Sequence, residues 1–294
     1  MRCFNPKCFN GVVVPCGKCL ACLEKKQKAW AFRLLEESKK ANNALFVTLT
    51  YNDESLPVVD GHPVLNYRDV QLFLKRLRKK VSPLKLRYFV CGEYGTTTFR
   101  PHYHMILFDL PIKDYYEAEN FLNGIWQHGF TDVKRVSVGR LYYVSKYCVS
   151  TSDLPKWYLE NRQYKPFIQV SRRPGIGHCF IEDSKNCQRM RDNLETIVHR
   201  DGYTYALPRY YRDAVFDDNM KSVILEDYKE TDQFKKLCAI FDLMSDSNNR
   251  YNLVKGIAGS SAEQRKILQQ HLNDCEIFTK RVEEKINKSK RKKS

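Results

Sequence analysis

Apolar residues between positions 45 and 150 alternate between strand-like and helix-like spacing, and this order restricts the fold more than any other feature of the sequence. Residues 45–51 form a run of β-branched and aromatic side chains that is typical of a strand. Helical spacing follows in Val70, Phe73, Leu74, Leu77 and Val81. Further strands are predicted at 86–93, 102–109 and 130–138, and further helices at 114–127 and 140–150. The first six elements have the order of a split βαβ, ferredoxin-like sandwich, so we expect an α+β fold with a central antiparallel sheet.

The segments on either side of this central domain, 41–150, have other patterns. Residues 1–40 are expected to form a cysteine-rich, metal-binding extension that continues into a helix over about 20–40. Residues 151–212 are aromatic and basic without a clear period, which predicts an irregular extension. The pattern over 213–294 is helical and ends in a basic tail, so we expect a helical C-terminal region.

Positive charge dominates the chain. Its 50 Lys and Arg residues against 34 Asp and Glu give a formal net charge of +16. This favours a polyanionic partner, because each neutralised phosphate releases counterions. An anionic membrane would also suit the charge, but the sequence has no amphipathic anchor and no run of about 18 apolar residues. The first residues form no apolar signal segment, so we expect an intracellular protein that binds nucleic acid and not a membrane.

His102 and His104 are separated by one residue at the start of a predicted strand. Alternate strand residues point to the same face, so both imidazoles can reach one metal ion, although two incidental polar residues would give the same pattern. If this strand pairs symmetrically with the preceding one, Glu93 lies opposite His102 and Cys91 opposite His104. A slip by one residue would remove Glu93 from the site. Two imidazoles and a carboxylate suit Mg²⁺ or Mn²⁺, while zinc or cobalt is also compatible.

Tyr143 and Tyr147 are four residues apart on a predicted helix. At about 100° per residue they share a face with Lys146, while Leu141 and Val144 lie on roughly the opposite face. A chain with 18 tyrosines also produces such pairs through packing alone. A phenol attacks phosphate poorly unless a metal polarises that phosphate. With this help, attack would give a covalent 5′-phosphotyrosine and a free 3′-hydroxyl, and Lys146 would stabilise phosphate charge or assist proton transfer.

Five of the 11 cysteines lie within the first 22 residues. In an intracellular protein such clustering favours metal binding over disulfides. Cys16, Cys19 and Cys22 have the spacing C-x-x-C-x-x-C, and Cys3 or Cys8 would complete a tetrahedral site, with Cys3 slightly favoured. Zinc in a structural role is the expected ion. An iron–sulfur cluster and a set of free buried thiols are the two alternatives.

Together these motifs resemble the HUH endonucleases, in which a hydrophobic residue separates two metal-binding histidines and a catalytic tyrosine lies on a nearby helix. The run at 46–51, the His102-Tyr103-His104 triplet and the helix with Tyr143 and Tyr147 look like three motifs of that superfamily. The Tyr-x-x-x-Tyr form is similar to the two-tyrosine class of small single-stranded DNA phages. Residues 41–150 are accordingly expected to be an HUH catalytic domain.

Further segments within residues 3–212 resemble the replication initiators of gokushovirus-type microviruses. These segments are 15–22, 92–95, 100–104, 171–177 and 207–211. The resemblance implies a rolling-circle initiator that nicks the origin of the double-stranded replicative form and religates the displaced single strand. Ser150 stands where family members often carry a lysine, so a role for a second lysine is not carried over.

The resemblance also implies partners. The chain contains no Gly-x-x-x-x-Gly-Lys-[Ser/Thr] loop, so we expect it to depend on a host helicase and polymerase in the cytoplasm of a bacterial host cell. DNA contacts are predicted at Arg100, Arg172, Arg173, Lys75, Arg76 and Lys79. The last three of these residues fit a solvated helix face equally well.

Two other functions remain open from the sequence. An HUH relaxase or single-strand transposase would use the same chemistry on another DNA substrate. A zinc-stabilised nucleic-acid-binding protein without catalysis would use the basic charge and the cysteines, and would leave the His, Glu and Tyr pattern as an accident.

Overall fold

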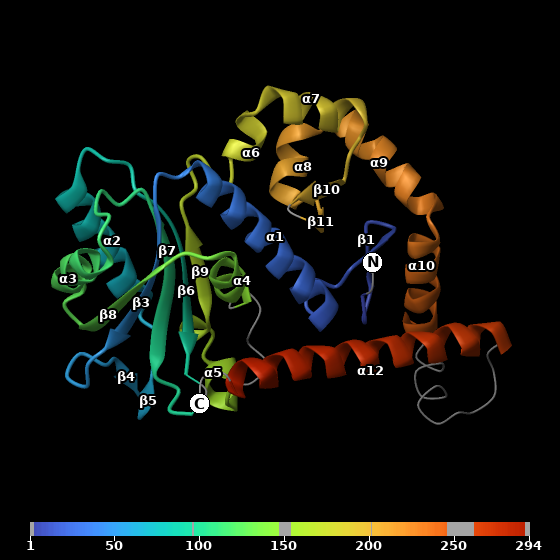
Figure 1. The fold of residues 1–294 in the computed structure, drawn as a ribbon. Coiled ribbons are helices and arrows are strands. Elements are labelled where there is room, and N and C mark those ends of the chain that lie inside the picture. The colour runs from blue at the N-terminus through green and yellow to red at the C-terminus, as the bar shows by residue number, and fades with distance from the viewer. Residues whose placement is uncertain (1–2, 96, 147–153, 201, 246–261, 292–294) are drawn as a thin grey trace. The chain divides into compact units, whose positions relative to one another are not determined.

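The computed structural model describes residues 3–95, 97–146, 154–200, 202–245 and 262–291. The chain folds as two compact units (Figure 1). Lys26–Val215 forms the larger unit, and Met1–Lys25 together with Phe216–Ser294 forms the smaller one. No helix among the described residues is long and apolar enough to cross a bilayer.

The larger unit is built on a five-stranded antiparallel sheet with the strand order β8-β3-β7-β6-β9. Its strands are β3 (Ala44–Tyr51), β6 (Arg87–Tyr94), β7 (Pro101–Phe108), β8 (Gly129–Arg135) and β9 (Phe167–Val170). β3 and β6 both pair antiparallel with β7, so they run parallel to each other with β7 between them. This is the split βαβ arrangement, and it confirms the predicted α+β sandwich with a central antiparallel sheet.

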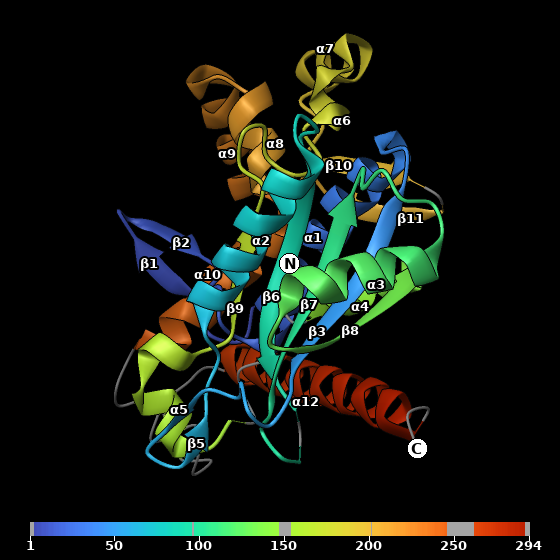
Figure 2. The same ribbon diagram turned by 90° about the vertical axis from the view of Figure 1, so that its left-hand side faces the viewer.

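Helices cover both faces of this sheet. α2 (Tyr67–Val81) and α3 (Tyr115–Trp126) lie against one face (Figure 2), while α1 (Leu20–Lys40) and α4 (Val138–Lys146) lie against the other (Figure 1). Because successive strand residues point to opposite faces, each strand contributes to two cores. In β3, Val47 and Leu49 pack in the core with α2 and α3, whereas Phe46 packs in the core with α1 and α4.

α2 illustrates how the sequence pattern fixes a helix in place. It begins after Asn66, whose side chain accepts a hydrogen bond from the backbone N–H of Arg68 and so caps the first turn. The helix ends at Val81, before the Ser82–Pro83 pair. The apolar residues that predict this helix are all buried in it: Val70, Phe73, Leu74, Leu77 and Val81.

The region after α4 is more regular than its sequence predicts. Its elements are α5 (Lys156–Glu160), a 3₁₀ turn η1 (Arg162–Tyr164), β9, α6 (Cys179–Glu182), α7 (Ser184–Asp192), β10 (Ile197–Arg200), β11 (Tyr203–Ala206) and α8 (Arg209–Val215). The expectation of an irregular stretch is therefore wrong for the described residues, because elements this short show no visible period. β9 extends the sheet beyond β6, where Phe167 lies opposite Gly92. A second short hairpin, β4 (Val58–Val59) and β5 (His62–Pro63), lies between β3 and α2 in the sequence.

The smaller unit combines the two ends of the chain. Its elements are the hairpin of β1 (Lys7–Phe9) and β2 (Val12–Val14), and the helices α9 (Asp218–Glu230), α10 (Asp232–Ser245) and α12 (Ala262–Arg291). Leu237 of α10 packs against Cys3 and Cys22, and the Phe4 ring makes an edge contact with Phe278 of α12. The predicted cysteine-rich N-terminus and helical C-terminal region are both present.

Candidate functional site

The candidate histidines lie on the strand pair in the expected register. Glu93 of β6 is paired with His102 of β7, and Cys91 with His104, which confirms the symmetrical pairing predicted from the sequence. These residues belong to the sheet face covered by α1 and α4, where Cys91 is part of the core. The sequence therefore places two imidazoles and one carboxylate on one face of adjacent strands.

His104 and Glu93 are in direct contact. The Nε2 atom of His104 lies 2.7 Å from Oε1 of Glu93, and its Nδ1 atom lies 3.2 Å from Oγ1 of Thr48 in the neighbouring strand β3. The His104 residue is only 8% exposed, so both ring nitrogens depend on these protein partners. Thr48 fixes the orientation of the ring, and this is the kind of support that metal-binding histidines have.

His102 is half-buried beside this pair. Burial and the neighbouring His104 lower the pKa of His102 below its ordinary value, although Glu93 opposes the shift. The ring packs close to Gly95, where an added Cβ would lie 3.3 Å from its Cε1 atom. His102 is therefore neutral at pH 7, which is the form of histidine that binds a metal.

These three side chains do not yet form a closed ligand cluster. Among the described residues, the cysteines discussed below are the only group of three or more His, Cys, Asp or Glu whose ligand atoms all lie within 4.8 Å of one another. Glu93 bonds directly to His104, while His102 does not come within that distance of both. The residue types fit a divalent cation, and the His104–Glu93 pair is the part that the fold brings together.

Tyr143 approaches this pair from α4. Its ring centroid lies 5.8 Å from that of His104 in an edge contact, and 6.2 Å from that of Phe46. Leu141 and Val144 are buried in the core, as the helical angles predict. Lys146 is the last residue of α4, and its side chain lies outside the part that the structure describes. Tyr147 also lies outside the described residues.

The adjacent phenol, Tyr142, has a structural role that the sequence does not reveal. Its hydroxyl lies 2.6 Å from that of Tyr205 in β11, and its carbonyl accepts a hydrogen bond from the Gln27 side chain in α1. Burial, and then the hydrogen bond to Tyr205, raise the pKa of Tyr142. Tyr142 therefore anchors α4, and the tyrosine beside His104 is Tyr143.

The predicted DNA contacts occupy three different places. Lys75 and Lys79 are exposed on α2, and Arg172 and Arg173 are exposed just after β9. Arg76 instead donates to the carbonyl oxygens of Ile125 and Trp126 at the end of α3. Arg100 donates to the Tyr51 carbonyl and pairs with Asp53.

The N-terminal cysteines form a compact cluster in the smaller unit. The sulfur atoms of Cys3, Cys16, Cys19 and Cys22 all lie within 4.8 Å of one another. The Cys3–Cys19 and Cys16–Cys22 separations are 3.9 and 4.0 Å. Cys3 is thus the fourth member, as favoured from the sequence, whereas Cys8 is exposed in β1. None of the described cysteines is in a disulfide.

Backbone N–H groups surround these sulfur atoms. Phe4 donates to Cys19, and Cys16 donates to Cys3. Burial alone would raise the pKa of the Cys16 thiol, but the N–H groups of Lys18 and Cys19 donate to its sulfur and lower the pKa to about 7. The pKa values of Cys3 and Cys22 are raised, mainly by burial. Four sulfur atoms at these separations can bind one metal ion.

Comparison with known proteins agrees with these features. Residues 44–152 match a family model of replication-associated proteins of the ORF2 type. Replication-associated protein VP4 of Bdellovibrio phage phiMH2K is 30% identical over 217 residues, which cover 68% of this chain and 66% of that protein. The chain belongs to the replication-associated proteins of microviruses.

Two further members of this family are similar to the chain. Replication-associated protein ORF4 of Chlamydia phage 1 is 28% identical, over 69% of this chain and 53% of that protein. Replication-associated protein ORF2 of Spiroplasma virus 4 is 26% identical, over 67% of this chain and 66% of that protein. The chain thus spans no more than 66% of the length of any of the three relatives.

The family match of residues 44–152 extends from the first strand of the sheet to just beyond α4. It includes Glu93, His102, His104 and Tyr143, and excludes the N-terminal cysteines and the arginines after β9. The side chains of the candidate active site therefore lie in the part of this replication-associated protein that the family model matches.

Proposed function

We propose that this replication-associated protein starts rolling-circle replication of a phage genome by nicking one DNA strand at the origin. The names of three relatives support a role in phage replication. The observation that carries the nicking chemistry is the 2.7 Å contact of His104 with Glu93, with the ring of Tyr143 beside it. The proposed substrates are the double-stranded replicative form and single-stranded origin DNA, and a host helicase and polymerase would be the partners.

In this proposal His102, His104 and Glu93 hold a divalent cation, Mg²⁺ or Mn²⁺. Two imidazoles and one carboxylate leave coordination positions open for phosphate oxygens and water. The lowered pKa of His102 favours the neutral ring, and the contact of Thr48 with Nδ1 of His104 leaves Nε2 directed toward Glu93. When bound, the cation would polarise the phosphate that is to be attacked.

Tyr143 is the proposed first nucleophile, and Tyr147, four residues later, the second. The phenol oxygen forms a bond to phosphorus while the bond from phosphorus to the 3′ oxygen breaks. The phenol proton passes to solvent or to Lys146, and the departing 3′ oxygen takes up a proton. The products are a 5′-phosphotyrosine and a free 3′-hydroxyl. Attack by a 3′-hydroxyl on the phosphotyrosine reverses these steps and religates the displaced strand.

The cysteine cluster would hold a structural zinc ion. Four sulfur atoms at about 2.3 Å from a tetrahedral zinc are about 3.8 Å apart, close to the 3.9 and 4.0 Å separations in the chain. A cluster with several iron atoms would spread its four ligands over more than one metal. The spacing therefore favours a single ion.

Nicking of the supercoiled phage replicative form tests the proposed metal site. Wild-type protein with Mg²⁺ or Mn²⁺ should convert it to the open circle, and EDTA should stop the reaction. His104→Ala and Glu93→Ala should each lower the rate by about 100-fold or more, because each removes a ligand. His199→Ala, which removes an exposed imidazole on β10, is the matched control and should nick at the wild-type rate. Nicking that persists in EDTA, or in Glu93→Ala, would contradict the proposal.

A further inference from the structure

We propose that a basic groove at the end of the sheet remote from His104 binds the phosphate backbone of DNA that flanks the cleavage site. This inference rests on the proposed function for the identity of its ligand. The groove has a volume of about 950 Å³ and lies entirely within the larger unit. Its walls come from the end of α1, the segment between α2 and β6, and the segment after β9.

The charge of this basic groove favours a polyanion. Its cations are Lys40, Arg78, Lys85, Arg87, Arg172 and Arg173, and its carboxylates are Glu37, Asp109 and Glu182. Glu37 pairs with Arg87, and Glu182 pairs with Lys40, so these four charges cancel. The remaining cations are exposed and have no ion pair with any described carboxylate; they are Arg78, Lys85, Arg172 and Arg173. Four cations against the single carboxylate of Asp109 make a site for several phosphates.

The arginines after β9 lie on a turn that is held at both ends. At its start, Ser171 bonds to Tyr88 twice: the Ser171 N–H donates to the Tyr88 carbonyl, and the Ser171 hydroxyl accepts from the Tyr88 N–H. Arg172 then forms a β-bridge with Gly175. The backbone that carries Arg172 and Arg173 is thus fixed before any ligand arrives, which lowers the entropic cost of binding.

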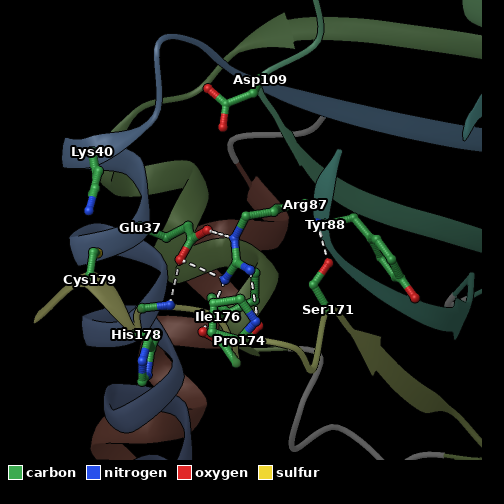
Figure 3. Close-up of polar contacts among 12 residues, drawn as sticks. Glu37, Lys40, Arg87, Tyr88, Asp109, Ser171, Pro174, Ile176, His178 and Cys179 are labelled. Atoms are coloured by element: carbon green, nitrogen blue, oxygen red, sulfur yellow. Dashed lines mark hydrogen bonds and ion pairs between the residues drawn. The ribbon is translucent and has the colours of Figure 1, made fainter. Parts of the chain in front are cut away.

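The other end of the turn is fixed by a buried ion pair (Figure 3). Both carboxylate oxygens of Glu37 accept hydrogen bonds from the guanidinium of Arg87. Arg87 also donates to the carbonyl oxygens of Pro174 and Gly175, each at 3.0 Å. Glu37 accepts a further hydrogen bond from the backbone N–H of Gly177 at 2.6 Å. We assign Glu37 and Arg87 as positioning residues that present the arginine turn to the groove.

The position of the groove identifies which part of the DNA it would contact. Arg87 begins β6 and Glu93 lies six residues further along the same strand. At about 3.3 Å per residue, the groove is about 20 Å from the candidate metal ligands. A DNA strand advances about 3.4 Å per nucleotide, so this distance corresponds to about six nucleotides. The groove would therefore bind flanking DNA, and the scissile phosphate would lie elsewhere.

The test compares short and extended DNA with the same cleavage site. The first probe is an oligonucleotide of about 10 nucleotides around the nick that wild-type protein makes; the second adds about 12 nucleotides on each side. The added flanks are supplied once as single strands and once as duplex, so that the two forms of backbone are distinguished. Binding is measured by fluorescence anisotropy over a range of salt concentrations.

Arg172→Ala with Arg173→Ala is the main variant. Cleavage of the short probe should stay at the wild-type rate, while affinity for at least one extended probe should fall about 10-fold or more. The slope of log K against log salt should fall by about 1.5 to 2, because two phosphate contacts are lost. Lys85→Glu, on a different wall of the groove, should reproduce this pattern and is a second route if the double variant unfolds.

The matched control is Lys113→Ala with Lys185→Ala, which removes the same charge from exposed positions outside the groove. Wild-type affinity of the groove variants for both extended probes, or an equal loss in the control, would overturn the proposal. If wild-type protein cleaves nothing, the proposed nicking fails; anisotropy on replicative-form fragments with and without the groove substitutions still decides the groove separately.

Discussion

At the residue scale, strand alternation decides which side chains meet in the candidate active site. Glu93, His102 and His104 face α1 and α4 because of their positions in two adjacent strands. Symmetrical pairing of those strands makes the three residues predictable from the sequence. Thr48 is not predictable in the same way, because its contact with His104 requires β3 to pair with β7 across 56 residues of sequence.

Gly177 is a residue at which an added methyl group has no room. Its φ is +78°, and a Cβ there would overlap the Tyr211 hydroxyl and lie 2.7 Å from the Arg33 carbonyl. Gly177→Ala should lower the free energy of unfolding of the larger unit by about 3 kcal/mol or more. Gly61→Ala is the control: its φ is +75°, but nothing lies within 4 Å, so it should cost only about 1 kcal/mol.

Urea unfolding followed by tryptophan fluorescence measures this difference, because Trp30, Trp126 and Trp157 all belong to the larger unit. Equal destabilisation by the two substitutions would mean that the close approach at Gly177 is absent.

The cysteine cluster allows a prediction about pH. In metal-free protein the pKa of Cys16 is about 7, whereas burial raises the pKa values of Cys3 and Cys22. Iodoacetamide reacts with thiolates, so Cys16 should be alkylated before the other two at pH 7.5. Its rate should fall as the pH drops below 7, where the thiol becomes protonated. Peptide mapping by mass spectrometry follows each site; faster labelling of Cys22 than of Cys16 would contradict the assignment.

At the scale of secondary-structure elements, periodicity determines what the sequence can predict. The strands of the βαββαβ core and the helix α2 carry enough apolar residues at regular spacing to be recognised. β9 has only the residues Phe167–Val170, and its place at the sheet edge depends on Gly92 making room for Phe167. The role of Tyr142 likewise depends on β11, which lies far along the chain and has no period of its own.

The ion pair of Glu37 and Arg87 joins three elements, α1, β6 and the turn after β9. Glu37→Gln keeps the shape of the side chain but leaves the half-buried Arg87 without its charge partner. The free energy of unfolding should fall by about 3 kcal/mol, because removing one member of a buried pair leaves an uncompensated charge. Glu182→Gln, in an exposed pair with Lys40, is the matched control and should change stability far less. Equal, small effects would show that Glu37 does not hold the turn.

At the scale of the whole molecule, the smaller unit depends on contacts between the two ends of the sequence. Met1–Lys25 and Phe216–Ser294 share one compact unit, in which Leu237 packs against Cys3 and Cys22. The sequence predicts both segments separately, as a cysteine cluster and as helices. Their association could not be predicted, because nothing in either pattern specifies a partner about 200 residues away.

Metal removal should therefore affect the C-terminal helices as well as the cysteines. Purified protein should contain one zinc ion per chain, and a strong chelator should lower the unfolding temperature of the smaller unit. Cys22→Ser should abolish zinc binding and increase proteolysis of α10. Cys8→Ser, at an exposed cysteine outside the cluster, should keep the zinc content and the stability of wild type. Full zinc content in Cys22→Ser would contradict the assigned ligand set.

Tyrosine attack on DNA is the central claim, and formation of a covalent adduct tests it most directly. A single-stranded oligonucleotide that spans the origin nick, labelled at its 3′ end, is incubated with protein and Mn²⁺ and resolved on a denaturing gel. Wild-type protein, and a Tyr116→Phe control at a 75% exposed phenol, should carry the label through a 5′-phosphotyrosine. The double variant Tyr143→Phe, Tyr147→Phe should carry none. Labelled protein from that double variant would contradict the account.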